Sequence, residues 1–271
     1  EQCGADTSDI ASAIGDAVTN HANIISMSLE GGTCSGSNDN DPVEGTAVAN
    51  AIANNVIVVA ASGNESANSV DAPGCDTGVI AVGATSLDDG TPNGTNNLGS
   101  NAHPAGTQLA PSEYVASYSN AGSPGSALHS ASAWGIVAPG GDPSDSELSG
   151  TADDLHWIED IWTSTPFMSS ASDITFVGEC TDDYPTSTAT VAPVDCRTLI
   201  AGTSMATPHV AGVAALVLAV SGGASSPYAT ASAMRTLLCS TADEINDSRE
   251  GCGRLNAYRA VATALSDPSL P

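Results

Sequence analysis

Ser204 stands where a reactive hydroxyl would be most useful. It follows Gly202 and Thr203 and precedes an apolar segment, Val210 to Val220, which predicts a buried helix starting near residue 204. The first turn of a helix presents free N–H groups and the positive end of the helix dipole. Ser204 is therefore a candidate nucleophile for a reaction that builds an oxyanion, although a serine before a helix is more often only a cap. Pro208 is expected in the first turn, where its missing N–H costs little.

Asn64 is the second candidate. The run VIVVAA at 56–61 predicts a buried strand, and Ser-Gly-Asn follows it directly. The side-chain amide of Asn64 could donate a hydrogen bond to an oxyanion. The alternative is an ordinary turn residue after Gly63.

Strands and helices alternate along the chain, which predicts an α/β fold with a parallel sheet flanked by helices. We expect helices at 8–20, 43–54, 204–220, 229–239 and 256–265, and strands at 23–29, 56–61, 78–84 and 134–138. Active sites of such sheets lie at the carboxyl ends of the strands, where Asn64 would stand. Residues 1–271 are expected to form one domain, with long insertions at about 86–115 and 140–200.

The segment GTSMATPHVAG at 202–212 resembles the nucleophile motif of the subtilisin-like serine proteases, the subtilases. Further segments resemble the family in the same order: residues 8–32, VIVVAASGN at 56–64, GVIAVGAT at 78–85, ASYSN at 116–120 and WGIVAPGG at 134–141. The resemblance implies a subtilisin-like fold and a serine endopeptidase acting on proteins or peptides. It also implies that Ser204 is the nucleophile and Asn64 an oxyanion donor.

Two motifs that the family places upstream of residue 8 are absent there: the Asp-[Thr/Ser]-Gly strand end and the His-Gly-Thr-His helix start. The five histidines do not replace them; they are His21, His103, His129, His156 and His209. His209 belongs to the nucleophile motif as a packing residue. We therefore expect a C-terminal portion of the catalytic domain, without the catalytic Asp and His. Such a chain would be inactive alone and would need the missing N-terminal segment as its partner.

The resemblance also outlines a specificity pocket. One wall is Ser28, Leu29, Glu30 and Gly31; the other is Ala60, Ala61, Ser62 and Gly63. Asp71 aligns with the pocket floor, and Glu65 follows Asn64. Three carboxylates around one pocket would favour a basic substrate side chain, unless they point to solvent.

The chain is strongly acidic, with 31 Asp and Glu against five Arg, no Lys and a net charge of −26. This surface argues against nucleic-acid and anionic-membrane partners. It suggests a secreted protein adapted to salt or divalent ions, or simply an acidic extracellular protein. No run is expected to be long enough to span a bilayer, and no signal peptide is visible.

Seven cysteines without a C-x-x-C pair suit disulfides better than zinc. Candidate pairs are Cys34–Cys75, Cys180–Cys196 and Cys239–Cys252, which leave Cys3 over, but the spacing alone fixes none of them. By analogy with the family, the loops at 142–147 or 181–183 could supply oxygens to a structural calcium ion.

Two other functions fit part of the pattern. A non-catalytic subtilase-like module, either a pseudoprotease or an acidic binding scaffold, would keep the fold without turnover. A different α/β serine hydrolase would need G-x-S-x-G, whereas this chain has G-T-S-M-A.

Overall fold

The computed structural model describes residues 5–32, 34, 41–88, 112–122, 128–141, 158–162 and 196–266. The elements, in chain order, are α1 Thr7–Thr19, β1 Ile24–Met27, α2 Pro42–Ala53, β2 Ile57–Ala61, β3 Ile80–Asp88, β4 Ser112–Val115, β5 Ile136–Pro139, β6 Ile158–Trp162, β7 Cys196–Ile200, α3 Thr203–Ser221, η4 Gly223–Ser225, α4 Ala231–Thr241 and α5 Ala257–Leu265. All nine expected helices and strands are confirmed, with shifts of a few residues at their ends.

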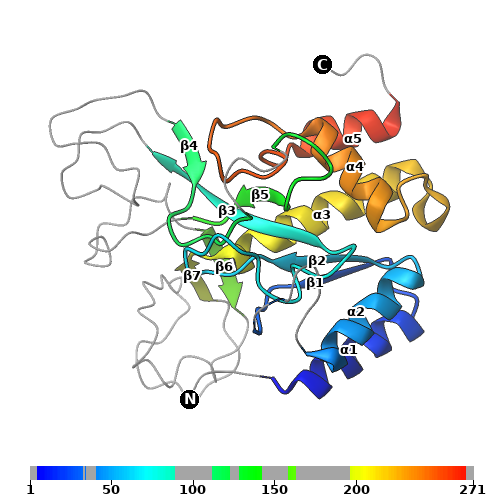
Figure 1. The fold of residues 1–271 in the computed structure, drawn as a ribbon. Helices are drawn as coiled ribbons and strands as arrows, with labels where there is room; N and C mark the ends of the chain where they lie inside the picture. Colours follow the sequence, from blue (N-terminus) through cyan, green and yellow to red (C-terminus); the bar gives the residue numbers. More distant parts are fainter. Residues whose placement is uncertain are drawn as a thin grey trace, which may run out of the picture.

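A mixed sheet forms the centre of the molecule (Figure 1). Strands β1, β2 and β3 are parallel neighbours, and β5 adds parallel to the other side of β3. Strand β4 pairs antiparallel with the end of β3. Helices α1 and α2 cover one face, and α3, α4 and α5 cover the other, so the predicted α/β class is confirmed.

Strand β2 lies between β1 and β3, and its position accounts for its sequence. Ile57 and Val59 belong to the core under α3, whereas Val58 and Ala60 belong to the core under α1 and α2. Because both faces are covered, the strand must be apolar at every position. Asn64 and Ser28 follow β2 and β1 at the same edge of the sheet.

Both expected insertions contain strands. Strand β3 continues to Asp88 and pairs with β4, inside the expected insertion at 86–115. Strands β6 and β7 pair antiparallel within the expected insertion at 140–200. Cys180, the candidate partner of Cys196, lies outside the described residues.

The disulfides Cys34–Cys75 and Cys239–Cys252 are confirmed, with Cα–Cα distances of 6.4 and 5.2 Å. Cys3 is outside the described residues. The first bond joins the segments that follow β1 and β2. The second joins the end of α4 to the segment before α5.

Helix α3 differs from its prediction in three ways. It is not buried all round, because Leu216 and Val220 are 53% and 38% exposed on one face. Pro208 lies in the second turn rather than the first. With 19 residues and a mean hydropathy of 1.5, α3 is long and apolar enough to cross a membrane, which the sequence reasoning had excluded. Half of that stretch is buried within the fold, as in an ordinary core helix.

Candidate active site

Ser204 is the second residue of α3, and the backbone around it is held from two sides. The N–H of the N-cap residue Gly202 donates to the carbonyl of Gly140, 2.9 Å away. The Ser204 hydroxyl donates to the carbonyl of Ser28 at 3.4 Å, and the Ser28 hydroxyl donates to the carbonyl of Ser204 at 2.7 Å. The N–H of Ser204 lies in the first turn, where a helix offers no internal acceptor.

Pro208 explains why Ser28 can reach the Ser204 carbonyl. In an uninterrupted helix, the N–H of residue 208 would donate to the carbonyl of residue 204. Proline has no N–H, so the carbonyl needs another donor. The Ser28 hydroxyl supplies it and thereby links the end of β1 to the start of α3.

Asn64 lies directly against the same helix start. Its Oδ1 accepts hydrogen bonds from the backbone N–H of Thr203 at 2.9 Å and from the Thr203 hydroxyl at 3.0 Å. These bonds fix the amide plane and turn Nδ2 outward, where it donates to Oε2 of Glu30 at 3.2 Å. The structure therefore brings Ser204 and Asn64, far apart in sequence, to one helix terminus.

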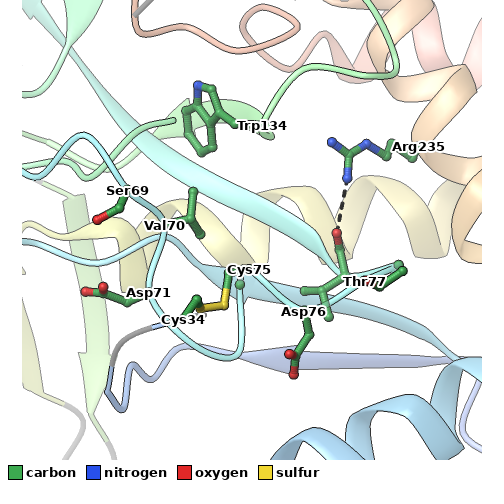
Figure 2. A pocket seen from close by; sticks show the side chains of 12 residues that line it. Cys34, Ser69, Val70, Asp71, Cys75, Asp76, Thr77, Trp134 and Arg235 are labelled. Atoms are coloured by element: carbon green, nitrogen blue, oxygen red, sulfur yellow. Dashed lines mark hydrogen bonds between the residues drawn. A yellow bond between two sulfur atoms is a disulfide. The ribbon is translucent and has the colours of Figure 1, made fainter. Parts of the chain in front are cut away.

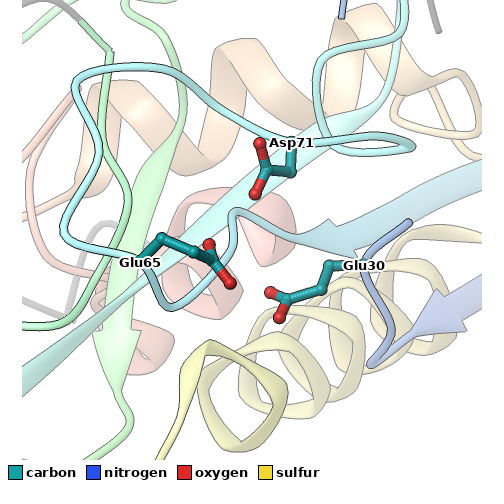
Figure 3. A group of neighbouring side chains, drawn as sticks. All are labelled: Glu30, Glu65 and Asp71. Carbon is teal, nitrogen blue, oxygen red and sulfur yellow. The ribbon is translucent and has the colours of Figure 1, made fainter. Parts of the chain in front are cut away.

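Glu30, Glu65 and Asp71 converge beside this helix start (Figure 3). Their carboxylate oxygens lie within 4.8 Å of one another. Partial burial and the charge of Glu65 raise the pKa of Glu30 from 4.5 to about 7, and burial and a hydrogen bond with Glu65 raise the pKa of Asp71 from 3.8 to about 6. Burial opposes ionisation of Glu65, but hydrogen bonds from Asp71, Asn120 and Asn64 lower its pKa.

Both predicted walls are hydrogen-bonded to the segment at residues 71–72. The N–H of Gly31 donates to the carbonyl of Ala72 at 3.0 Å, and the N–H of Asp71 donates to the carbonyl of Ser62 at 3.0 Å. Ala61 and Ser62 are completely buried and form the base of the second wall. The side chain of Leu29 packs against the core under α1 and α2.

A cavity of about 580 Å³ lies behind Asp71 (Figure 2). Its walls include Trp134 and Arg235, and the guanidinium of Arg235 donates to the carbonyls of Val79, Ala131 and Ala133. Burial lowers the pKa of Arg235. Sequence reasoning gave no signal for this cavity, because its lining comes from segments spread between residues 34 and 235.

None of the described histidines is hydrogen-bonded to Ser204. Nδ1 of His209 lies 2.8 Å from the carbonyl of Met205 in the same helix. His129 lies 2.8 Å from Glu250 and 3.3 Å from Glu244, and its hydrogen bond with Glu250 raises its pKa. His21 lies in the turn after α1. His103 and His156 are outside the described residues.

The loops 142–147 and 181–183, from which calcium ligands were expected, also lie outside the described residues. Within the described ranges, the Glu30, Glu65 and Asp71 cluster is the one group of three metal-ligating side chains that converge. Its hydrogen bonds to Asn64 and Asn120 account for the geometry, and we assign it no metal.

Sequence reasoning missed Asn120 as a residue of the site. It ends the quoted segment ASYSN and is completely buried against the loop that carries Asn64. The motif was the available signal, but nothing in it says which loop the side chain contacts.

Comparisons with known proteins agree with this fold. A protease from Pseudoalteromonas arctica PAMC 21717 is 28% identical, with a TM-score of 0.62, over 97% of this chain and 60% of that one. The prenylagaramide maturation protease PagA is 24% identical, with a TM-score of 0.58, over 98% of this chain and 70% of that one. A lanthipeptide protease is 21% identical, with a TM-score of 0.57, over 97% of this chain and 68% of that one.

This chain therefore spans 60% to 70% of the length of these solved proteases. The sequence model of the subtilase family, Peptidase_S8, matches residues 1–258. The chain belongs to the subtilase family of peptidases.

Proposed function

We propose that this chain carries the nucleophile and the oxyanion donors of a subtilase-type serine endopeptidase. Ser204 attacks the peptide carbonyl, and the Ser204 N–H and the Asn64 amide stabilise the oxyanion. The observation that carries the proposal is the pair of hydrogen bonds from Thr203 to Asn64 Oδ1. They hold the donor amide beside the helix start that bears the nucleophile.

We further propose that a segment outside the 271 residues supplies the general base and its orienting acid. No described histidine reaches Ser204, and no His-Gly-Thr-His run occurs in the sequence. Its one Asp-Thr-Gly tripeptide, at 76–78, precedes β3 instead of ending a strand. Two surfaces suit such a segment. The outer edge of β1 has no partner strand among the described residues, and the exposed face of α3 carries Leu216 and Val220.

The experiment compares the 271-residue chain and the full-length gene product on a fluorogenic peptide, each with its Ser204→Ala variant. We expect Ser204-dependent turnover by the gene product and at least a thousandfold less by the chain, because a triad lacking a member retains little activity. Ser204-dependent turnover by the chain would assign the base to one of its own histidines. A gene product without Ser204-dependent turnover would favour the non-catalytic module, which the bond between Glu30 and the Asn64 amide also suits.

We propose that the substrate residue before the cleaved bond is Arg or Lys. Support comes from the convergence of Glu30, Glu65 and Asp71 beside the helix start of Ser204. The test uses two peptides that differ only in Arg or Leu at that position. The gene product should prefer Arg, and Asp71→Asn should reduce that preference; a preference for Leu would contradict it.

Secretion is a further proposal, supported by two disulfides, because such bonds persist mainly in oxidising compartments. Fractionation of the source cells should recover the protein outside the cytoplasm. A structural calcium ion is proposed by analogy with the family and is tested below together with salt.

A further inference from the structure

Asn120 is hydrogen-bonded to the loop at residues 62–71, which carries Asn64, through both its backbone and its side chain. Its backbone N–H donates to the carbonyl of Gly63 at 3.0 Å, and its carbonyl accepts from the Ser62 hydroxyl at 2.8 Å. Its side chain also bonds to this loop, and the whole residue is completely buried. A buried amide with every group engaged has a defined orientation.

The oxygen of the side-chain amide binds backbone N–H groups, and its nitrogen binds carboxylates. Oδ1 accepts from the backbone N–H groups of Glu65 at 3.0 Å and Ala67 at 2.8 Å, so it fixes the loop just after Asn64. Nδ2 donates to Oε2 of Glu65 at 2.8 Å and to Oδ2 of Asp71 at 2.9 Å. One nitrogen therefore holds two carboxylates side by side.

The absence of a side chain at Gly63 leaves the space that this contact needs. A Cβ on Gly63 would lie 2.1 Å from Nδ2 of Asn120 and 2.6 Å from Oδ2 of Asp71. Its φ of +107° also favours glycine. The backbone thus leaves space for the amide and carboxylate to meet directly above residue 63.

We propose that Asn120 is the positioning residue of the specificity pocket, holding Glu65 and Asp71 as a fixed carboxylate pair for a cationic substrate side chain. The inference rests on the basic preference proposed above. Asn120 acts through the two carboxylates and does not itself need to touch the substrate.

The charged groups around Glu65 and Asp71 determine how the pKa values of these two carboxyl groups respond to loss of the Asn120 donor. Glu30 faces the pair from the segment after β1, and Arg235 lines the cavity that Asp71 also borders. The first turn of α3 contributes no acidic side chain. A hydrogen bond to a carboxylate favours its ionised form. Loss of Nδ2 should therefore raise the pKa values of Glu65 and Asp71, whereas a collapsed, solvated loop would return Asp71 toward its ordinary lower value.

The experiment uses benzamidinium as a cationic probe and neutral benzamide as its isosteric control, with the 271-residue chain. Carboxyl carbon NMR follows the titration of Glu65 and Asp71. The wild type should bind benzamidinium at least tenfold tighter than benzamide at pH 8. In Asn120→Ala the two carboxyl groups should titrate at higher pH, and benzamidinium affinity at pH 7 should fall at least fivefold without a change for benzamide.

Two further variants separate positioning from folding. Asn120→Asp keeps an acceptor for the loop N–H groups but puts a further carboxyl group beside Glu65 and Asp71. The titration of Glu65 and Asp71 should therefore also move to higher pH, and thermal stability should fall at pH 8 but stay near wild type at pH 4, where the carboxyl groups are protonated. Asn256→Ala is the matched control. Asn256 likewise accepts a backbone N–H, from Arg259 at 2.9 Å, and donates to a carboxylate, Asp243 at 3.0 Å, and belongs to the N-terminus of α5.

The outcomes are distinct. A wild type that does not distinguish the two probes overturns the basic preference, and the role of Asn120 with it. A wild type that does distinguish them, with unchanged or lower titration midpoints and unchanged affinity in Asn120→Ala, overturns the role of Asn120 alone. A shift of equal size in Asn256→Ala would also overturn it.

Discussion

Glu30 accepts the amide hydrogen that the proposed reaction would offer to an oxyanion. The bond from Asn64 Nδ2 is 3.2 Å long, and Glu30 has a pKa raised to about 7. Substrate binding must therefore compete with a neighbouring carboxylate for the same donor. The position of this residue in the pocket wall was expected, but its contact with Asn64 was not.

The raised pKa of Glu30 predicts a pH-dependent change in stability. A carboxyl whose pKa is higher in the folded state binds a proton on folding, so stability falls as pH rises from about 4.5 to about 7. Glu30→Gln removes this loss and should raise the melting temperature relative to wild type at pH 8 but not at pH 4. The control Asp16→Asn removes one charge at an exposed position of α1. An equal rise in melting temperature in that variant would show that the effect comes from net charge alone.

Asn64 gives the second prediction at this scale. In the full-length gene product, Asn64→Ala should lower kcat on the order of a hundredfold with little change in KM, because an oxyanion donor acts on the transition state. Asn64→Asp is the matched variant, since it keeps the acceptor for Thr203 and loses the donor. A kcat within about twofold of wild type with a raised KM would make Asn64 a binding or turn element.

Among the elements, α3 connects the site to the sheet. It packs on β1, β2, β3 and β5, and its N-terminus meets the segments that follow β1 and β2. The proline in its second turn leaves the Ser204 carbonyl open to the Ser28 hydroxyl. Ser204 is thus held by contacts between elements as well as by its own helix.

A double-mutant cycle tests this connection. Ser28→Ala should lower the free energy of unfolding by about 1 kcal/mol, because it removes one hydrogen bond to a backbone carbonyl. Pro208→Ala supplies the missing helical N–H, so the same Ser28→Ala change should cost less in that background. Thermal or denaturant unfolding of the four proteins measures the coupling. Additive effects would show that the serine and the proline act independently.

The whole molecule is dominated by its charge of −26. The ion pairs formed by described arginines gather near the C-terminal segments, where Arg249, Arg254 and Arg259 meet acidic neighbours. Five basic residues cannot neutralise the charge of 31 acidic ones, so most of the negative charge is uncompensated within the chain. Organisation as one domain over residues 1–271 stays a prediction.

We predict that the melting temperature rises when NaCl increases from about 0.05 to about 1 M, because counter-ions screen the repulsion. Calcium is tested separately, by adding calcium or a chelator at constant ionic strength. A change only with calcium would indicate specific binding, and a change only with NaCl would indicate screening. No response to either would contradict both proposals.

The sequence by itself determined the family, the order of the elements, and Ser204 and Asn64 as the candidate catalytic residues. These depend on local patterns: the apolar run of β2, the alternation of strands and helices, and the motif at 202–212. It also suggested the two disulfides that the structure describes, as candidates among several pairings.

Only the tertiary structure decided which polar groups meet. Strand β4 is only four residues long, and it forms because the end of β3 offers it an edge. The contacts of Asn120 with Glu65 and Asp71, and of Ser28 with Ser204, join residues 49 to 176 positions apart. Such contacts depend on the register and packing of the sheet, which the local residue pattern does not contain, so a sequence predicts the groups that can react more readily than the groups that hold them.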